Sequence, residues 1–350
     1  MRKDFFSTDI IEWYHSHHRD LPWRRTRDPY RIWLSEIILQ QTRVAQGLPY
    51  YNEFVETFPS VFDLAKAPEQ KVLRLWQGLG YYSRARNLHQ CAKDIVENYG
   101  GVFPSSFEEL KKLKGVGPYT AAAIASFAFR ESVAVVDGNV FRVLSRVFGI
   151  DKDIASEEGK KNFFALATEL IDNQQPDLFN QAVMEFGALH CLPKNPKCDE
   201  CIFSKKCEAN RKDLQTTLPI KSKKLKIRTR YLNYFVIHSG NRIYMRQRNG
   251  KDIWKGLYDF YLIETARNQR LETLMNSDQL LSKSSVISEG KVYTHILSHQ
   301  KLKVKFIEVK KSLSKSDELR VKKLGLKKFN RGVVFKLPKP ILIDKFLKSL

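Results

Sequence analysis

The chain has 350 residues, of which 43% are hydrophobic and 12% aromatic. This length and apolar content support two folded domains and argue against a disordered chain. Lysine and arginine number 60 against 38 aspartate and glutamate, which gives a formal charge of +22. Such an excess predicts a polyanionic partner, with nucleic acid ahead of a membrane surface, and the alternative is a solvated basic surface without a partner.

The sequence lacks two kinds of apolar stretch. No window reaches the roughly 18 apolar residues of a membrane-spanning helix, and the N-terminus has no signal-peptide run. We therefore expect a soluble intracellular protein with no membrane partner. Four of the five cysteines fall between Cys191 and Cys207. This clustering is typical of a metal site rather than of a secreted disulfide framework.

An apolar periodicity predicts a helix over Ile32 to Gly47, after a turn at Leu21 to Arg24. Glu36 lies in this helix, and the neighbouring residues are apolar nearly all round. A glutamate in such surroundings is partly buried and has a raised pKa, so it can act as an acid near neutral pH. A solvated helix carboxylate is the alternative.

Residues 76–87, WQGLGYYSRARN, combine glycines, two adjacent tyrosines and two arginines. Glycines before the tyrosines and arginines after them favour a surface tip that stacks against nucleic-acid bases. A pair of core tyrosines is the alternative.

Gly115 and Gly117 flank Val116 in a turn that precedes Pro118, a residue suited to the first turn of a helix. Backbone N–H groups at such a turn, aimed along a helix N-terminus, form an anion site. The pattern predicts a helix-hairpin-helix that grips a nucleic-acid backbone without reading its sequence.

Asp137 follows an apolar run and opens a helix with periodic valines and leucines. It can serve simply as an N-cap. Because it comes just after the hairpin, it can also face a sugar whose glycosidic bond is breaking, where positive charge needs an anion.

The four clustered cysteines have the spacing C-x6-C-x2-C-x5-C; they are Cys191, Cys198, Cys201 and Cys207. Four thiolates can hold a tetrahedral zinc ion or a four-iron cluster, and the spacing alone does not decide between them. Four lysines lie within this loop, which suggests that the loop also meets phosphate.

The chain changes character after residue 220. We expect a helical domain over 1–220, a basic linker over 221–230, and a second domain over 231–350 that begins with alternating, strand-like segments. Residues 301–350 contain 16 Lys or Arg against 4 Asp or Glu, which suggests that this part lies along DNA.

The segments SEIILQQTRV, GLGYYSRARN, GVGPYTA and VVDGNVFRVL resemble the endonuclease III superfamily of DNA glycosylases, most closely the MutY-type adenine glycosylases. The resemblance implies a multidomain protein. An all-α helix-hairpin-helix glycosylase domain with an iron-sulfur loop at 191–207 is followed by an α+β Nudix-like domain. It also implies a monomeric base excision repair enzyme, cytoplasmic and associated with the nucleoid. The expected substrate is double-stranded DNA with adenine opposite 8-oxoguanine or guanine.

The same resemblance implies a role for each matching residue. Glu36 would protonate the adenine and Asp137 would stabilise the sugar cation, with Tyr119 and Asn139 holding the water and the carboxylates. The remaining assignments are Trp23 and Arg24 in the base pocket, Gln41 and Tyr81 filling the hole in the base stack, Gly115, Val116 and Gly117 on the DNA backbone, and Cys191, Cys198, Cys201 and Cys207 on a [4Fe-4S] cluster.

One residue and two segments refine the activity that the resemblance implies. Bifunctional relatives carry a lysine nucleophile where this chain has Tyr119, which implies no lyase activity. Residues 265–281 lack the glutamate-rich Nudix metal box, so we do not expect nucleotide hydrolysis. The segment THILSHQ resembles the one that distinguishes 8-oxoguanine from guanine; its residues here are Leu297, Ser298 and His299, with Leu297 where the family often has phenylalanine.

Two other functions are open: a bifunctional glycosylase for oxidised pyrimidines, and a DNA-binding module without enzymatic activity. Glu36 and Asp137 together favour an enzyme, because backbone binding needs neither an acid nor an anion beside the sugar.

Overall fold

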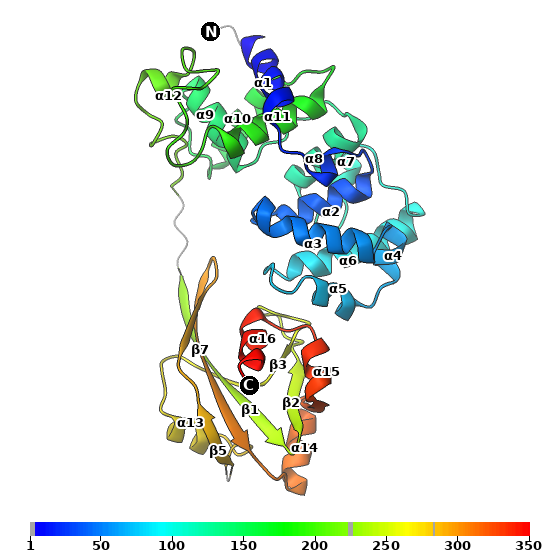
Figure 1. The fold of residues 1–350 in the computed structure, drawn as a ribbon, viewed down its shortest axis with the longest axis vertical. Helices are drawn as coiled ribbons and strands as arrows, with labels where there is room; N and C mark the ends of the chain where they lie inside the picture. Colours follow the sequence, from blue (N-terminus) through cyan, green and yellow to red (C-terminus); the bar gives the residue numbers. More distant parts are fainter. Residues whose placement is uncertain (1–3, 223–226, 283) are drawn as a thin grey trace. The chain divides into compact units, whose positions relative to one another are not determined.

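The computed structural model describes residues 4–222, 227–282 and 284–350. The chain divides into two compact units (Figure 1), one comprising Met1–Lys66 with Asn87–Lys223 and the other Ala67–Arg86 with Lys224–Leu350. The first unit is helical and the second contains a sheet. Within the described ranges, no helix combines the length and the apolar character needed to cross a membrane.

The helices of the first part of the chain are short and joined by tight turns. They are α1 (Asp4–His17), the 3-10 turn η1 (Pro22–Arg24), α2 (Pro29–Leu39), α3 (Val44–Thr57), α4 (Val61–Lys66), α5 (Glu69–Leu75), α6 (Ser83–Tyr99), α7 (Phe107–Leu110), α8 (Pro118–Phe129), α9 (Gly138–Phe148), α10 (Glu157–Leu170), α11 (Pro176–Leu189) and α12 (Glu208–Arg211).

The helical unit has two groups of helices (Figure 1): α1 and α9–α12 form one, and α2, α3, α7 and α8 belong to the other. In the first group, Phe6 of α1 stacks on Phe203 at a centroid distance of 5.0 Å, inside a core that also contains Phe163 and Phe186. In the second group, α8 is buried over almost its whole length, because its alanines allow close approach of neighbouring helices. The two groups meet where α8 contacts α11.

The single helix predicted over Ile32–Gly47 is wrong, because the chain breaks between α2 and α3. A turn closes when the Thr42 N–H donates to the Leu39 carbonyl at 3.0 Å, and Gln41 takes a left-handed φ of 55°. Gly47 allows α3 to return against α2, since a Cβ there would lie 2.7 Å from Leu39 Cδ2. An apolar pattern that continues through a break gives no sign of the break.

The second unit is built on an eight-stranded sheet with the main order β3-β2-β1-β7-β5. Its central strands, β1 (Arg228–Ser239) and β7 (Gln300–Lys310), are parallel. The remaining strands are β2 (Arg242–Gln247), β3 (Tyr258–Asp259), β4 (Tyr261–Thr265), β5 (Ser285–Glu289), β6 (Tyr293–Ile296) and β8 (Lys327–Asn330). Four helices follow or separate them: α13 (Leu271–Ser277), α14 (Lys315–Lys323), α15 (Arg331–Lys336) and α16 (Ile341–Lys348).

Helices cover both faces of this sheet. On one face, Leu274 of α13 and Val321 of α14 share a core with Ile307 and Val309 of β7. On the other face, Phe346 of α16 stacks on Phe306 of the same strand at 4.3 Å. Successive side chains of β7 point to opposite faces of the sheet, so this strand contributes apolar residues to the core on each face.

Residues 67–86 group with the sheet unit through specific contacts. Arg86 donates to the Lys255 carbonyl at 2.7 Å, and the Tyr81 hydroxyl donates to Ser298 Oγ at 2.8 Å. The boundary between the two units at Arg86 and Asn87 falls inside α6, which continues unbroken from Ser83 to Tyr99. We therefore still propose 1–220 and 231–350 as the domain limits. Within the expected linker 221–230, residues 223–226 lie outside the described residues, and β1 begins at Arg228.

Candidate active site

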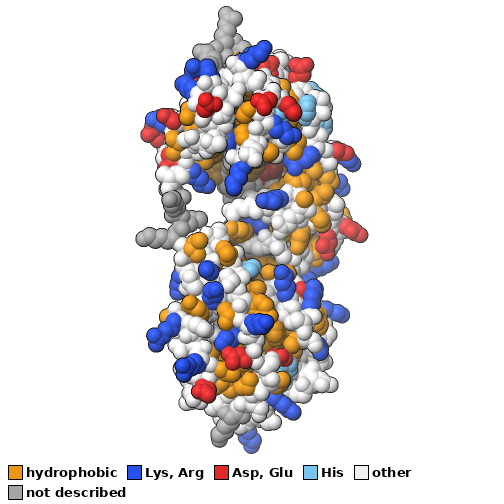
Figure 2. All heavy atoms as spheres, turned by 60° about the vertical axis from the view of Figure 1, so that its left-hand side comes forward, with side chains coloured by type: hydrophobic (Ala, Val, Ile, Leu, Met, Phe, Trp, Pro, Cys, Tyr) orange, Lys and Arg blue, Asp and Glu red, His pale blue; other side chains and the backbone are white. Residues whose placement is uncertain are grey.

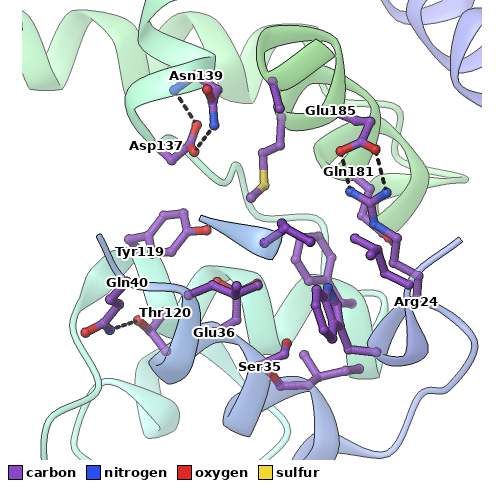
Figure 3. A pocket seen from close by; sticks show the side chains of 18 of the residues that line it. Arg24, Ser35, Glu36, Gln40, Tyr119, Thr120, Asp137, Asn139, Gln181 and Glu185 are labelled. Atoms are coloured by element: carbon purple, nitrogen blue, oxygen red, sulfur yellow. Dashed lines mark hydrogen bonds and ion pairs between the residues drawn. The ribbon is translucent and has the colours of Figure 1, made fainter. Parts of the chain in front are cut away.

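A cleft of about 1470 Å³ opens in the helical unit. Its walls come from η1, α2, the turn before α8, the start of α9, and α11 (Figure 3). The cleft brings together most of the residues predicted from the sequence. They are Trp23, Arg24, Glu36, Gln41, Gly115, Gly117, Tyr119, Asp137 and Asn139.

Glu36 points into the cleft from α2, and its residue surface is only 8% exposed. Burial raises the pKa of Glu36 to about 7, although a hydrogen bond with Tyr119 lowers it and the negative charge of Asp137 raises it further. A substantial fraction of this carboxyl group is therefore protonated at neutral pH, as a general acid requires. The flanking apolar residues of α2 are the cause, because they deny the carboxylate its water.

Tyr119 lies in the first turn of α8, directly after Pro118, and shares a hydrogen bond with Glu36. Burial and the two nearby carboxyl groups raise the pKa of Tyr119 well above its usual value. The phenol therefore stays protonated and can act as a neutral hydrogen-bond donor in the cleft.

Asp137 is the N-cap of α9 and also lines the cleft. Its Oδ1 accepts from the backbone N–H groups of Asn139 and Val140, each at 2.8 Å, and its Oδ2 accepts from Asn139 Nδ2 at 2.7 Å. Burial raises the pKa of Asp137, while these hydrogen bonds oppose that rise and favour the anion. The N-cap and the functional interpretation are thus compatible, since the cap fixes the direction of the carboxylate.

Arg142 connects Asn139, the partner of the capping Asp137 carboxylate, to the cysteine loop. Its Nη2 donates to Asn139 Oδ1 at 2.8 Å, and its Nε donates to the carbonyl of Cys191 at 2.7 Å. Gly187 permits this arrangement, because a Cβ there would lie 2.6 Å from Asn139 Cβ. The position of Asn139 therefore depends on both α11 and the cysteine loop.

An ion-pair cluster holds the other side of the cleft (Figure 3). Glu185 of α11 accepts two hydrogen bonds from Arg24, at 2.9 and 2.7 Å, and further hydrogen bonds from Arg19. Burial alone would raise the pKa of Glu185, but the two arginines outweigh it and lower that pKa to about 2. Arg24 is thereby fixed near Glu36, and its positive charge acts on the pKa of that acid.

The remaining wall is partly aromatic and partly amide. Trp23 is buried and meets Tyr51 edge to face at 5.0 Å. Tyr14 donates to Gln181 Oε1 at 3.1 Å, which leaves the amide N–H₂ of Gln181 as a donor at the cleft. A flat base would meet an aromatic surface and several directed donors here.

The glycine turn has the conformation that its sequence suggests. Gly115 has a φ of 78° and lies against Asn87, whose Cβ would be 2.7 Å from an added side chain. Gly117 is the N-cap of α8 without a side-chain cap, so the first N–H groups of that helix are available to an anion. Val116, in contrast, is buried and anchors the turn from within.

The two residues expected to enter the base stack share an unusual backbone. Gln41 and Tyr81 are exposed non-glycine residues with positive φ, 55° and 45° respectively. Such strain is typical of functional positions. Gln41 lines the cleft, whereas Tyr81 lies in the sheet unit with the β6–β7 turn at Leu297–His299, where the Leu297 N–H donates to the Gln300 carbonyl at 2.7 Å.

The four clustered cysteines surround a small cavity of about 20 Å³. Arg146 Nη1 approaches Cys191 Sγ at 3.4 Å, and the Phe203 N–H donates to Cys201 Sγ at 3.4 Å. Among the described residues, no group of three or more His, Cys, Asp and Glu side chains is arranged to hold a metal ion. The donor set itself fits an iron-sulfur cluster by its chemistry, because four cysteines line one cavity and N–H groups donate to the sulfurs of Cys191 and Cys201.

Comparisons with known proteins match this architecture. Residues 34–168 match the HhH-GPD superfamily of base excision DNA repair proteins, and residues 233–349 match the NUDIX domain. Over 298 residues the chain is 36% identical to the adenine DNA glycosylase of Buchnera aphidicola subsp. Baizongia pistaciae, covering 84% of this chain and 83% of that protein. The chain belongs to the adenine DNA glycosylase family.

Solved structures of DNA glycosylases match the helical part of this chain. A thermostable thymine-DNA glycosylase aligns with a TM-score of 0.55 and 32% identity over 60% of this chain and 97% of its own. Endonuclease III from a complex with DNA has the same fold, with a TM-score of 0.53 and 21% identity over 61% of this chain and 99% of its own. The predicted fold class is confirmed, and the protein is a DNA glycosylase of base excision repair that acts on DNA.

Sequence reasoning missed several cleft residues of this glycosylase. Glu185 looked like an ordinary helix glutamate, and Arg19 and Gln181 carried no motif. Arg142, which contacts Asn139 without lining the cleft, was likewise indistinguishable from a surface arginine of α9. In each case the partner lies far away in the chain, so only the fold reveals the contact.

Proposed function

We propose that this glycosylase removes adenine paired with 8-oxoguanine or guanine and leaves the DNA strand uncut. The observation that carries the proposal is the pairing of two buried carboxyl groups with different hydrogen bonding at one cleft. Burial raises the pKa of both groups, to about 7 for Glu36, but Asp137 accepts three hydrogen bonds that oppose this rise and favour its anion. Environments that separate two carboxyl groups in this way assign one as acid and the other as anion.

The proposed reaction begins when adenine leaves the base stack and enters the cleft, between Trp23 and the amide of Gln181. Glu36 donates its proton to N7 of the adenine. The C1′–N9 bond then breaks, its electron pair leaves with the base, and the adenine departs uncharged. A neutral leaving group lowers the barrier because no negative charge develops on the purine.

Positive charge remains on the sugar, and Asp137 supplies the nearby anion. Its carboxylate is already oriented by α9 and Asn139, so little reorganisation is needed. Water adds its oxygen to C1′ and gives up a proton to the Glu36 carboxylate, which restores the acid. If Asp137 first captures the cation, water then attacks from the original face and retains the configuration.

Tyr119 supports the hydrolytic outcome. A lyase needs an amine at this place to form a Schiff base with C1′, and a phenol with a raised pKa cannot supply one. In the proposal, Tyr119 and Asn139 hold the water and the carboxylates in place.

The pH dependence of base release follows from the Glu36 pKa. The acid must be protonated, so the second-order rate constant should fall as pH rises through about 7 and approach a tenfold loss per pH unit. Rates measured on limiting duplex from pH 5.5 to 9 test this. A rate constant that stays level up to pH 9 would contradict the assignment.

The four cysteines would hold a [4Fe-4S] cluster, which would tie the 191–207 loop to α9 through Arg142 and Arg146. We expect about four irons per chain and no zinc, on the four-thiolate ligand count. Metal analysis of the purified protein measures this. Cys198→Ser should lower both iron content and folded yield, while Cys91→Ser, the matched change at a cysteine outside the loop, should keep the iron.

Reading of the opposite base is proposed for the β6–β7 turn. Ser298 and His299 are exposed there, and Ser298 Oγ already accepts a hydrogen bond from Tyr81, the other expected contact with the mispair. Polar groups at this turn can recognise the N7–H and O8 edge that distinguishes 8-oxoguanine from guanine. The net charge of +22 supports duplex DNA as the partner. In the proposal, the protein binds this DNA as a monomer and acts at the nucleoid.

The test is a double variant, Ser298→Ala with His299→Ala. The preference for adenine opposite 8-oxoguanine over adenine opposite guanine should narrow by ~1 to 3 kcal/mol, the scale of one lost buried hydrogen bond, while chemistry survives. Single-turnover rates on both duplexes give the ratio. Thr294→Ala, a polar change on β6 outside the turn, is the control, and an unchanged ratio in the double variant would mean that the lesion is read elsewhere.

A further inference from the structure

A second cavity, of about 590 Å³, lies in the sheet unit and includes none of the active-site residues. It is lined by the end of β2, by the loop that follows, and by the turn between α14 and β8. Its volume is within the range of about 300–1,000 Å³ typical of small-ligand sites.

The fold brings two lysines to this cavity from opposite sides of one turn. Lys323 is the last residue of α14, and the chain then reverses at Gly325, whose φ is 69°. Lys327 begins β8, where it pairs with Met245 of β2. Both lysines are exposed and both line the cavity.

The cavity has an excess of positive charge. Its lining includes no carboxylate, and neither lysine has an ion pair within the described part of the chain. Arg248 is fully occupied by Asp259 at 2.6 Å and Asp252 at 2.9 Å. Arg246 lies farther from Asp259, with its Nε at 3.5 Å from Oδ1.

Neutral groups at the same cavity also lack partners. The amide of Asn249 and the hydroxyl of Tyr258 make no hydrogen bond among the described residues, and the Tyr258 ring is fixed edge to face against Phe329 at 5.8 Å. Met245 and Leu262 add apolar surface. A ligand with an anionic end and a flat or apolar end matches this combination.

We propose that this cavity is a phosphate-binding site, in which Lys323, Lys327 and Arg246 contact the phosphate and Tyr258 contacts the group attached to it. Favourable interaction with the C-terminal end of α14 accounts for Lys323 alone, because Lys327 lies on β8. The phosphate belongs either to the DNA backbone or to a soluble nucleotide. Both sources present the same chemistry to the three cations.

The test compares two charge-matched double variants of the full chain. The cavity variant is Lys323→Ala with Lys327→Ala, and the control is Lys315→Ala with Lys336→Ala, two exposed lysines of the same unit that do not line the cavity. Inorganic pyrophosphate and an undamaged duplex are titrated separately at low salt. Melting temperatures and base release verify that both variants fold, since neither change touches the active-site cleft.

Pyrophosphate affinity about tenfold weaker in the cavity variant than in the control would support the proposal and indicate a soluble ligand. A loss confined to duplex affinity, with a salt dependence reduced by about two phosphate contacts, would support it with the DNA backbone as the source. Equal affinities of the two variants for both probes would overturn it, whether or not adenine is the base released.

Discussion

Glu36→Gln should reduce adenine release at least about 100-fold while duplex affinity stays near that of the unchanged protein. Glutamine keeps the size of the side chain and can still accept from Tyr119, but it has no proton to give to N7 of the adenine. The loss should therefore appear in the single-turnover rate and not in binding. Quenched single-turnover assays and a gel-shift titration measure the two quantities.

The matched control is Glu12→Gln, the same chemical change at an exposed position of α1. It should leave both rate and affinity unaltered. The pH dependence should also disappear in Glu36→Gln if residual activity is measurable. A Glu36→Gln protein that retains more than about one hundredth of the activity would remove Glu36 from the role of acid.

Asp137→Asn should lower the rate of base release by about 10²- to 10³-fold, the scale seen when one preorganised electrostatic contact to a transition state is removed. The amide oxygen of asparagine can still cap α9, so the loss of charge is separated from the loss of the cap. Single-turnover rates and thermal unfolding of the same preparation distinguish these effects.

Ser156→Ala provides the complementary control. Ser156 caps α10 through a hydrogen bond from the Gly159 N–H at 2.9 Å, and it does not line the cleft. This change should lower the free energy of unfolding by about 1 kcal/mol without affecting catalysis. If Asp137→Asn loses stability but releases base at the normal rate, Asp137 is only a cap.

Some of the site could be predicted because its signals are local. The raised pKa of Glu36 follows from apolar neighbours in its own helix, and the placement of Asp137 follows from the helix that it opens. The cysteine spacing identifies a four-thiol site in the same way. The fold class was likewise accessible, since helical and alternating patterns change at the expected part of the chain.

Other features depend on contacts between distant segments. Glu185, which holds Arg24, is 161 positions away from it in the sequence, and Arg142 joins Asn139 to the Cys191 carbonyl. The positive φ of Gln41 and Tyr81 is imposed by turns that tolerate strain, not by residue preference. No periodicity encodes such pairings or such strain.

The central claim is that Glu36 and Asp137 hydrolyse the glycosidic bond of adenine in a mispair. It is tested most directly by base release from three duplexes, containing adenine opposite 8-oxoguanine, adenine opposite thymine, or thymine glycol, each with borohydride present and absent. We predict release of free adenine from the first duplex only, an intact strand until alkali is added, and no covalent protein–DNA product. Release of thymine glycol with strand cleavage and borohydride trapping would contradict the account.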